Sequence, residues 1–131
     1  MASIRKVLHL SASADTVWDA LADFQNVHTR IAPGFVTASK PDGDGARLVT
    51  FANGSVAREV LVACDPALRR LVYTIPSERL THHSASAEIV SERTGCRFIW
   101  TTDVTPDAMA PYIDGQMSAG AAVMQRTLDG A

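Results

Sequence analysis

The chain has few cysteines and no long apolar run. Its two cysteines, Cys64 and Cys96, lack the spacing of a metal site, and we predict two buried free thiols in a reducing cytoplasm rather than a disulfide. No apolar stretch approaches the ~18 residues of a spanning helix. The first residues, MASIRKVLHLSAS, alternate like a strand and lack the apolar core of a signal peptide. We therefore expect a cytoplasmic protein without a membrane span.

An excess of charge of one sign is also absent. Lysine and arginine number 12 against 14 acidic residues, and the net charge of −2 gives no electrostatic reason to expect nucleic acid as a partner. The sequence contains no phosphate-binding glycine loop, no dinucleotide fingerprint and no nucleophile–base pair at a meaningful local spacing. We predict that the protein uses no cofactor and no metal.

The pattern of apolar residues predicts an α+β domain over residues 1–131. Ser13 stands at an N-cap position before an amphipathic helix over 14–22, and a second short helix over 26–32 is stopped by Pro33-Gly34. A long helix opens at 105–107 and runs towards 129. Short polar turns between the expected strands favour an antiparallel meander. The expected strands cover residues 4–10, 35–40, 46–52, 55–64, 69–75, 80–91 and 96–104.

The last helix has small residues in its middle, including Gly115 and Gly120. Small side chains let a helix pack closely on a sheet, but they would equally leave a void between the two. Methionines on the same helix suit an irregular apolar ligand as well as an irregular core. Close packing and a cavity therefore both remain open for this helix.

Several strings resemble the START-like, birch-pollen-allergen-like superfamily (SRPBCC), most closely its polyketide cyclase/dehydrase and lipid-transport branch. The resemblance covers essentially the whole chain. It rests on residues 14–24 (ADTVWDALADF), Pro33-Gly34, residues 58–60 (REV) leading to Asp65-Pro66, residues 71–73 (LVY), residues 95–100 (GCRFIW) and the closing helix after Pro106.

This resemblance implies a helix-grip fold, in which a curved seven-stranded antiparallel sheet wraps around the long C-terminal helix. Two short helices after the first strand plug one end, and an apolar cavity lies between sheet and helix. Members bind lipids, polyketides or other hydrophobic molecules, and some catalyse cyclisation, dehydration or condensation. The fold alone does not decide between these functions.

Four polar side chains are candidates for chemistry. His28 and Arg30 lie on the short second helix, which the resemblance places at the cavity entrance; either they point into solvent, or Arg30 binds an anionic or carbonyl oxygen and His28 transfers a proton. His83 shares a strand face with Ala85, Ala87 and Ile89, so it is favoured over His82 as the inward histidine. An inward histidine serves as a hydrogen-bonded core residue more often than as a catalyst.

Glu59 and Arg58 are adjacent on one strand, so only one of them faces inward. A cavity carboxylate would have a raised pKa and could act as a general base. We favour the alternative, in which Glu59 is an exterior residue paired with an arginine of a neighbouring strand.

The candidate ligand contacts are mostly apolar or aromatic. Tyr73 and Trp100 each combine a large apolar surface with one polar atom that could orient a ligand, although both would serve equally well in a core. The full set is Trp18, Val27, Tyr73, His83, Phe98, Trp100, Tyr112, Ile113, Met117, Gly120 and Met124.

Three functions are consistent with these residues. The favoured one is binding of a small hydrophobic molecule without chemistry, because the acid–base groups are scattered over several strands. The alternative is a cofactor-independent cyclase or dehydratase, which needs two or more polar groups converging on the cavity. A regulatory partner with a filled core is the third. An edge strand or the exposed side of the sheet would be the surface for a homodimer.

Overall fold

The computed structural model describes residues 1–129, in which seven antiparallel strands form one sheet in the order β1-β7-β6-β5-β4-β3-β2. The strands are β1 (Ala2–Leu10), β2 (Val36–Pro41), β3 (Ala46–Phe51), β4 (Val56–Asp65), β5 (Arg70–Thr74), β6 (His82–Ser91) and β7 (Cys96–Thr105). The helices are α1 (Ala14–Ala22), α2 (Val27–Arg30) and α3 (Ala110–Leu128), with single turns of 3₁₀ helix at η1 (Phe24–Asn26) and η2 (Asp107–Met109). The predicted helix-grip fold is confirmed.

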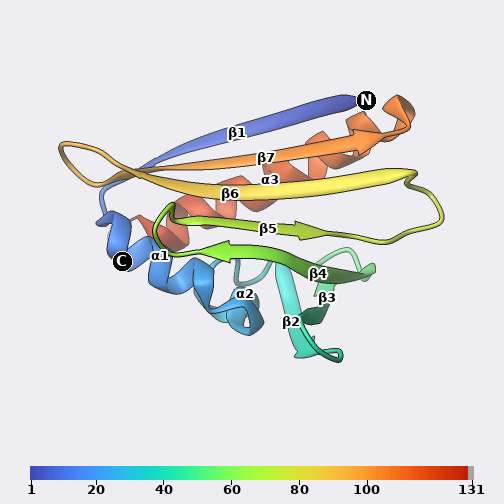
Figure 1. The fold of residues 1–131 in the computed structure, drawn as a ribbon, viewed down its shortest axis with the longest axis horizontal. Helices are drawn as coiled ribbons and strands as arrows, with labels where there is room; N and C mark the ends of the chain where they lie inside the picture. The colour runs from blue at the N-terminus through green and yellow to red at the C-terminus, as the bar shows by residue number, and fades with distance from the viewer. Residues whose placement is uncertain (130–131) are drawn as a thin grey trace.

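The helices lie where a curved sheet needs cover. Figure 1 shows α3 on one face of the sheet, behind β1, β6 and β7 in this view, while α1 and α2 lie at one end. The Ser13 hydroxyl accepts a hydrogen bond from the Thr16 backbone N–H at 3.2 Å, which caps α1 as its sequence predicts. The second helix is shorter than predicted, because Asn26 belongs to η1 and α2 ends at Arg30, with Ile31 as its C-cap. No helix in the described part of the chain has the length and apolarity to cross a bilayer.

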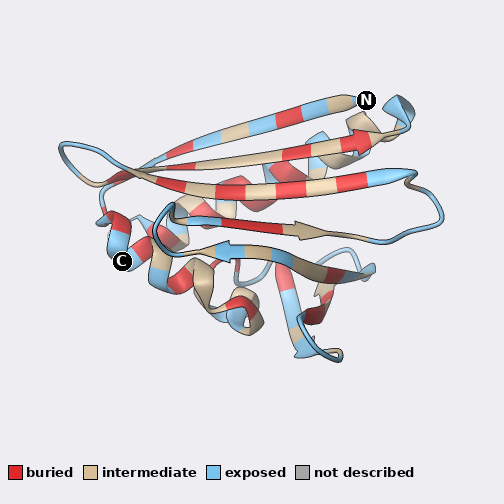
Figure 2. Ribbon diagram, viewed as in Figure 1, coloured by how far each residue is buried: buried red, intermediate tan, exposed pale blue. Residues whose placement is uncertain are grey.

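Alternate residues of the central strands build the core (Figure 2). The larger cluster of buried side chains gathers around Val17, Phe98 and Leu128, at the α1 end of the sheet. A smaller cluster contains Ile4, Val104 and Met117. Trp100 packs against both clusters, and so it lies between the two parts of the core.

The two helix glycines have different surroundings. A Cβ atom at Gly120 would lie 3.1 Å from a Phe35 ring carbon and 3.3 Å from a Trp100 ring carbon, so α3 packs closely at this point. A Cβ atom at Gly115 would meet nothing within 4 Å, and Gly115 is exposed. The sequence left close packing and a void open; close packing holds at Gly120.

One cysteine expectation needs correction. Cys96 is a buried free thiol, as predicted, whereas Cys64 is free but exposed. Cys64 follows Val62 on the outward face of β4, and the Val62 side chain is 62 % exposed. The apolar character of this outward row made it resemble a buried one.

The glycines provide a matched test of packing. Exchanging Gly120 for leucine should lower the free energy of unfolding by about 1–3 kcal/mol, because the new side chain collides with two aromatic rings. Exchanging Gly115 for alanine should raise it by up to about 1 kcal/mol through helix propensity alone. Urea unfolding followed by circular dichroism measures both changes. A Gly120→Leu protein as stable as the wild type would contradict the close packing.

Candidate functional site

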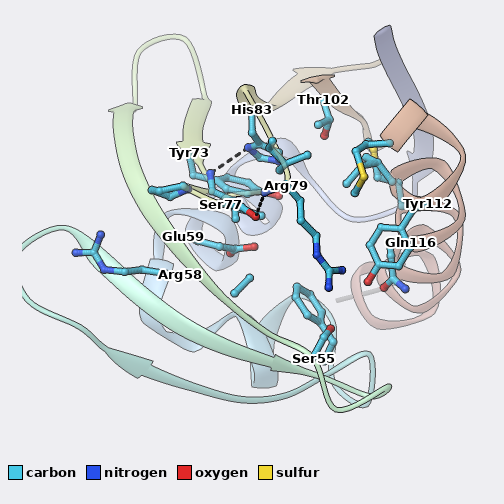
Figure 3. Close-up of a pocket in the computed structure, with 18 of the residues that line it drawn as sticks. Ser55, Arg58, Glu59, Tyr73, Ser77, Arg79, His83, Thr102, Tyr112 and Gln116 are labelled. Atoms are coloured by element: carbon cyan, nitrogen blue, oxygen red, sulfur yellow. Dashed lines mark hydrogen bonds between the residues drawn. The ribbon is translucent and has the colours of Figure 1, made fainter. Parts of the chain in front are cut away.

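A cavity of about 450 Å³ lies between the concave side of the sheet and the first half of α3. Residues of β4 to β7, the β5–β6 loop and the η2–α3 segment line it (Figure 3). A second chamber of about 70 Å³ extends towards α2 and the second half of α3. Five residues border both spaces and so form the partition between them: Phe35, Phe51, Glu59, Tyr73 and Trp100.

Most of the larger cavity has an apolar lining. The rings of Phe35 and Phe51 pack at a centroid distance of 5.5 Å, and Trp100, Ile113 and Met117 contribute from β7 and α3. Ligand sites of this size class are typically hydrophobic, with a small number of polar groups that fix the ligand's orientation. The lining therefore suits a molecule with an apolar body.

A buried ion pair lies at the partition. Arg47 of β3 stands directly opposite Glu59 of β4 in the sheet register. Its Nε and Nη2 atoms lie 2.8 and 2.7 Å from Glu59 Oε1, and its Nη1 donates to the Phe24 carbonyl. The guanidinium carbon also lies 3.7 Å from the centroid of the Phe24 ring. Arg47 is 6 % exposed and Glu59 is 5 % exposed.

The expectation that Glu59 is exterior was therefore wrong, although its partner is an arginine of a neighbouring strand. Burial raises the pKa of the Glu59 carboxyl, and the attraction of Arg47 opposes this only in part. Both contacts with Arg47 end on Oε1, so Oε2 accepts neither of them. Figure 3 shows the carboxylate directed towards the cavity. A carboxylate with a raised pKa is suited to proton transfer near neutral pH.

His83 faces inward, as the alternation on β6 predicted, and is 7 % exposed. Its Nδ1 accepts a hydrogen bond from the Ile75 backbone N–H at 3.1 Å, so the proton of the neutral ring resides on Nε2. Burial lowers the pKa of His83 to about 4, and the neighbouring charge of His82 acts in the same direction. His83 is therefore a neutral hydrogen-bond donor at physiological pH.

Tyr73 extends the polar row on the next strand. Its ring centroid lies 6.1 Å from that of His83. Burial and the negative charge of Glu59 raise the pKa of the Tyr73 hydroxyl. The charge of Arg47 and a hydrogen bond with Trp100 lower this pKa, but by less. Four consecutive strands, β4 to β7, thus each contribute one polar side chain to the larger cavity: Glu59, Tyr73, His83 and the buried Thr102.

His28 and Arg30 lie away from this cavity. The Arg30 guanidinium donates to Asp19 at 2.6 Å and to Asp23 at 3.0 Å, so it joins α2 to α1 and to the residue that follows α1. Neither His28 nor Arg30 lines either chamber. The His28 Nδ1 is buried and has no hydrogen-bond partner among residues 1–129. The structure thus corrects their expected position at the entrance, which is formed instead by the β5–β6 loop and the start of α3.

Nine of the eleven expected ligand contacts border one of the two spaces. Trp18 does not, because it packs from α1 against the larger core cluster, and Gly120 does not, because two rings cover it. The larger cavity is bordered by Tyr73, His83, Trp100, Tyr112, Ile113 and Met117; the smaller by Tyr73, Trp100, Val27, Phe98 and Met124.

Sequence reasoning missed Arg47, the aromatic pair Phe35 and Phe51, and Arg79 of the β5–β6 loop. Arg47 could have been found, since it alternates with Val49 and Phe51 on β3. Arg79 lies in a loop, where no periodicity exists. Among residues 1–129, no cluster of three or more histidine, cysteine or acidic side chains could hold a metal ion.

Comparisons with known proteins agree with this fold. The model of the family described as polyketide cyclase/dehydrase and lipid transport matches residues 1–130. A solved protein from Thermobifida fusca is 29 % identical, with a TM-score of 0.79, and the match covers 98 % of this chain and 91 % of that one. An uncharacterised Bacillus thuringiensis protein is 18 % identical, with a TM-score of 0.84 over 97 % and 98 % of the chains.

The solved structures also include a plant enzyme with the same fold. Norcoclaurine synthase from Thalictrum flavum is 20 % identical, with a TM-score of 0.73, and the match covers 95 % of this chain and 91 % of that one. At this identity the likeness concerns the fold alone. A search of the curated proteins found no match.

The buried histidine predicts how stability depends on pH. Between pH 6.5 and about 4 the unfolded chain binds a proton that folded His83 does not, so the free energy of unfolding falls as the pH falls through this range. The loss should be roughly 3 kcal/mol. Urea unfolding at a series of pH values measures it.

His83→Gln should remove most of this pH dependence, since glutamine keeps an acceptor for the Ile75 N–H and does not titrate. His82→Gln is the matched control and should keep most of it, because burial is the larger cause of the His83 shift. Equal slopes in the wild type and His83→Gln would show that other groups carry the effect.

Proposed function

Because the chain belongs to the polyketide cyclase/dehydrase and lipid-transport family, we propose that it binds a small hydrophobic molecule, such as a lipid or a polyketide, between the sheet and α3. The observation that carries the proposal is the cavity of about 450 Å³, whose aromatic lining surrounds a few inward polar groups. This volume lies within the range of small-molecule sites, roughly 300–1,000 Å³.

The polar groups suit recognition of an oxygen atom on the ligand. Neutral His83 and Tyr73 are both donors, and both lie in a water-poor environment where a hydrogen bond discriminates strongly against a ligand that lacks the acceptor. The apolar body of the ligand would lie against Phe35, Phe51 and Trp100. A cytoplasmic location and a homodimer remain predictions from the sequence.

The proposal is tested with N-phenyl-1-naphthylamine, an uncharged fluorescent probe of apolar cavities. The wild type should bind it with increased fluorescence. Ala57→Trp should weaken binding at least about tenfold, because Ala57 lines the cavity and the indole would occupy its space. Val62→Trp on the same strand is the control and should bind like the wild type, since Val62 points outward. Absence of binding to the wild type, or equal binding to both variants, would contradict the proposal.

A second candidate function is acid–base chemistry on the bound molecule. It is favoured by one observation: Glu59, Tyr73 and His83 line the same cavity from three consecutive strands. In this cofactor-independent cyclase- or dehydratase-type reaction, Glu59 Oε2 takes a proton from the carbon beside a ketone. The electron pair of that C–H bond forms a carbon–carbon double bond while the π pair of the carbonyl moves to the ketone oxygen, and the resulting enolate oxygen accepts a hydrogen bond from Tyr73 or His83.

The proton transfer is tested by hydrogen exchange in deuterium oxide. The wild type should accelerate deuterium uptake beside the carbonyl of 4-phenyl-2-butanone, followed by nuclear magnetic resonance. Glu59→Gln should lose roughly 100-fold or more of this acceleration, while retained binding of N-phenyl-1-naphthylamine shows that the cavity is intact. A variant as active as the wild type would exclude Glu59 as the base, and no acceleration by the wild type would leave binding alone as the function.

A further inference from the structure

Two arginines border the larger cavity, Arg58 and Arg79. Figure 3 shows the Arg58 side chain directed away from the cavity. Arg58 is neutralised, because its Nε donates to the Asp42 carboxylate at 2.8 Å. Arg79 makes no ion pair with any side chain of the described residues 1–129. Figure 3 shows the Arg79 side chain extending from the β5–β6 loop across the opening, towards the region of Ser55, Tyr112 and Gln116.

The other charges of the lining do not offset Arg79. Among residues 1–129, Glu59 is the only residue with a carboxylate that borders the cavity, and it is already paired with Arg47 at 2.7 Å. Glu78 precedes Arg79 in the chain, but it neither lines the cavity nor forms an ion pair with Arg79. The opening therefore carries one uncompensated positive charge above an apolar interior.

The loop that carries Arg79 is braced by its own hydrogen bonds. The Arg79 backbone N–H donates to the Ser77 hydroxyl at 3.2 Å, and the Leu80 N–H donates to the Ser77 carbonyl at 3.2 Å. Pro76 and Leu80 of the same loop line the cavity with apolar atoms. The backbone thus places the start of the Arg79 side chain at the rim, while its guanidinium remains accessible to a ligand.

From this arrangement we propose that the ligand is an amphipathic monocarboxylic acid, bound with its carboxylate on Arg79 at the opening and its apolar chain in the cavity. The planar guanidinium offers paired N–H donors that match a carboxylate. Gln116 and Tyr112, which line the same opening, supply neutral polar groups beside it. The inference rests on the proposed binding function and adds the chemical class and the orientation of the ligand.

The test compares two competitors of equal chain length, decanoic acid and decanol, as they displace N-phenyl-1-naphthylamine at neutral pH. In the wild type the acid should displace the probe at a lower concentration than the alcohol. Arg79→Gln should raise the concentration of decanoic acid needed to displace the probe by roughly 3- to 10-fold. This range lies between the effect of losing an exposed ion pair and that of losing a buried charged hydrogen bond. Displacement by decanol should change less than about twofold, because the alcohol carries no charge for Arg79 to bind.

Arg58→Gln is the charge-matched control, since the Arg58 side chain points away from the cavity and is held by Asp42, and it should leave displacement by both competitors unchanged. Added salt should weaken binding of decanoic acid to the wild type, because it screens the charge of Arg79, and should have little effect on binding to Arg79→Gln. The inference would be overturned if decanoic acid displaced the probe equally well from Arg79→Gln and the wild type, or if Arg58→Gln weakened displacement by the acid as much as Arg79→Gln does. Either result would leave the proposed function intact. Failure of the probe to bind the wild type would instead refute the proposed function.

Discussion

The ion pair between Arg47 and Glu59 is the constraint on which the site depends. It joins β3 to β4, and the hydrogen bond from Arg47 to the Phe24 carbonyl links both strands to η1, the turn between α1 and α2. Removing two charges from water is costly, and such a pair contributes mainly when all its donors and acceptors are matched. Here one carboxylate oxygen, one backbone carbonyl and the face of one aromatic ring contact the Arg47 guanidinium, while Glu59 Oε2 accepts no hydrogen bond from it. Loss of either partner would leave an isolated buried charge, at a cost of roughly 3–5 kcal/mol.

The same pair makes the interior polar without making it charged overall. Glu59 contributes a carboxylate with a raised pKa, while Arg47, which borders the smaller chamber, supplies the compensating charge. Tyr73 and His83 stay neutral on either side of physiological pH for the same physical reason, burial. Because these groups are neutral or paired, a ligand that offers an acceptor to His83 or Tyr73 can lie beside them without burying an isolated charge.

The sequence predicted the fold better than the site, because periodicity identifies elements more readily than it identifies faces. All seven strands and all three helices lie close to their expected ranges, and the alternation on β6 placed His83 correctly. The same reasoning was wrong for Glu59, because the outward row of β4 contains Val56 and Val62, which are more apolar than the inward row. Arg30 was also misplaced, since no local pattern reveals that Asp19 and Asp23 hold its guanidinium.

Close packing and open space occur along one helix, α3, and the close packing positions one wall of the open space. In its second half, Gly120 lets the helix approach the rings of Phe35 and Trp100. Those two rings belong to the partition between the chambers, so the close approach fixes the inner wall of the larger cavity. In its first half, Ile113 and Met117 face the cavity, and the β5–β6 loop with Arg79 borders its opening. A bulkier residue at position 120 would therefore displace the wall of the cavity although it does not itself line it.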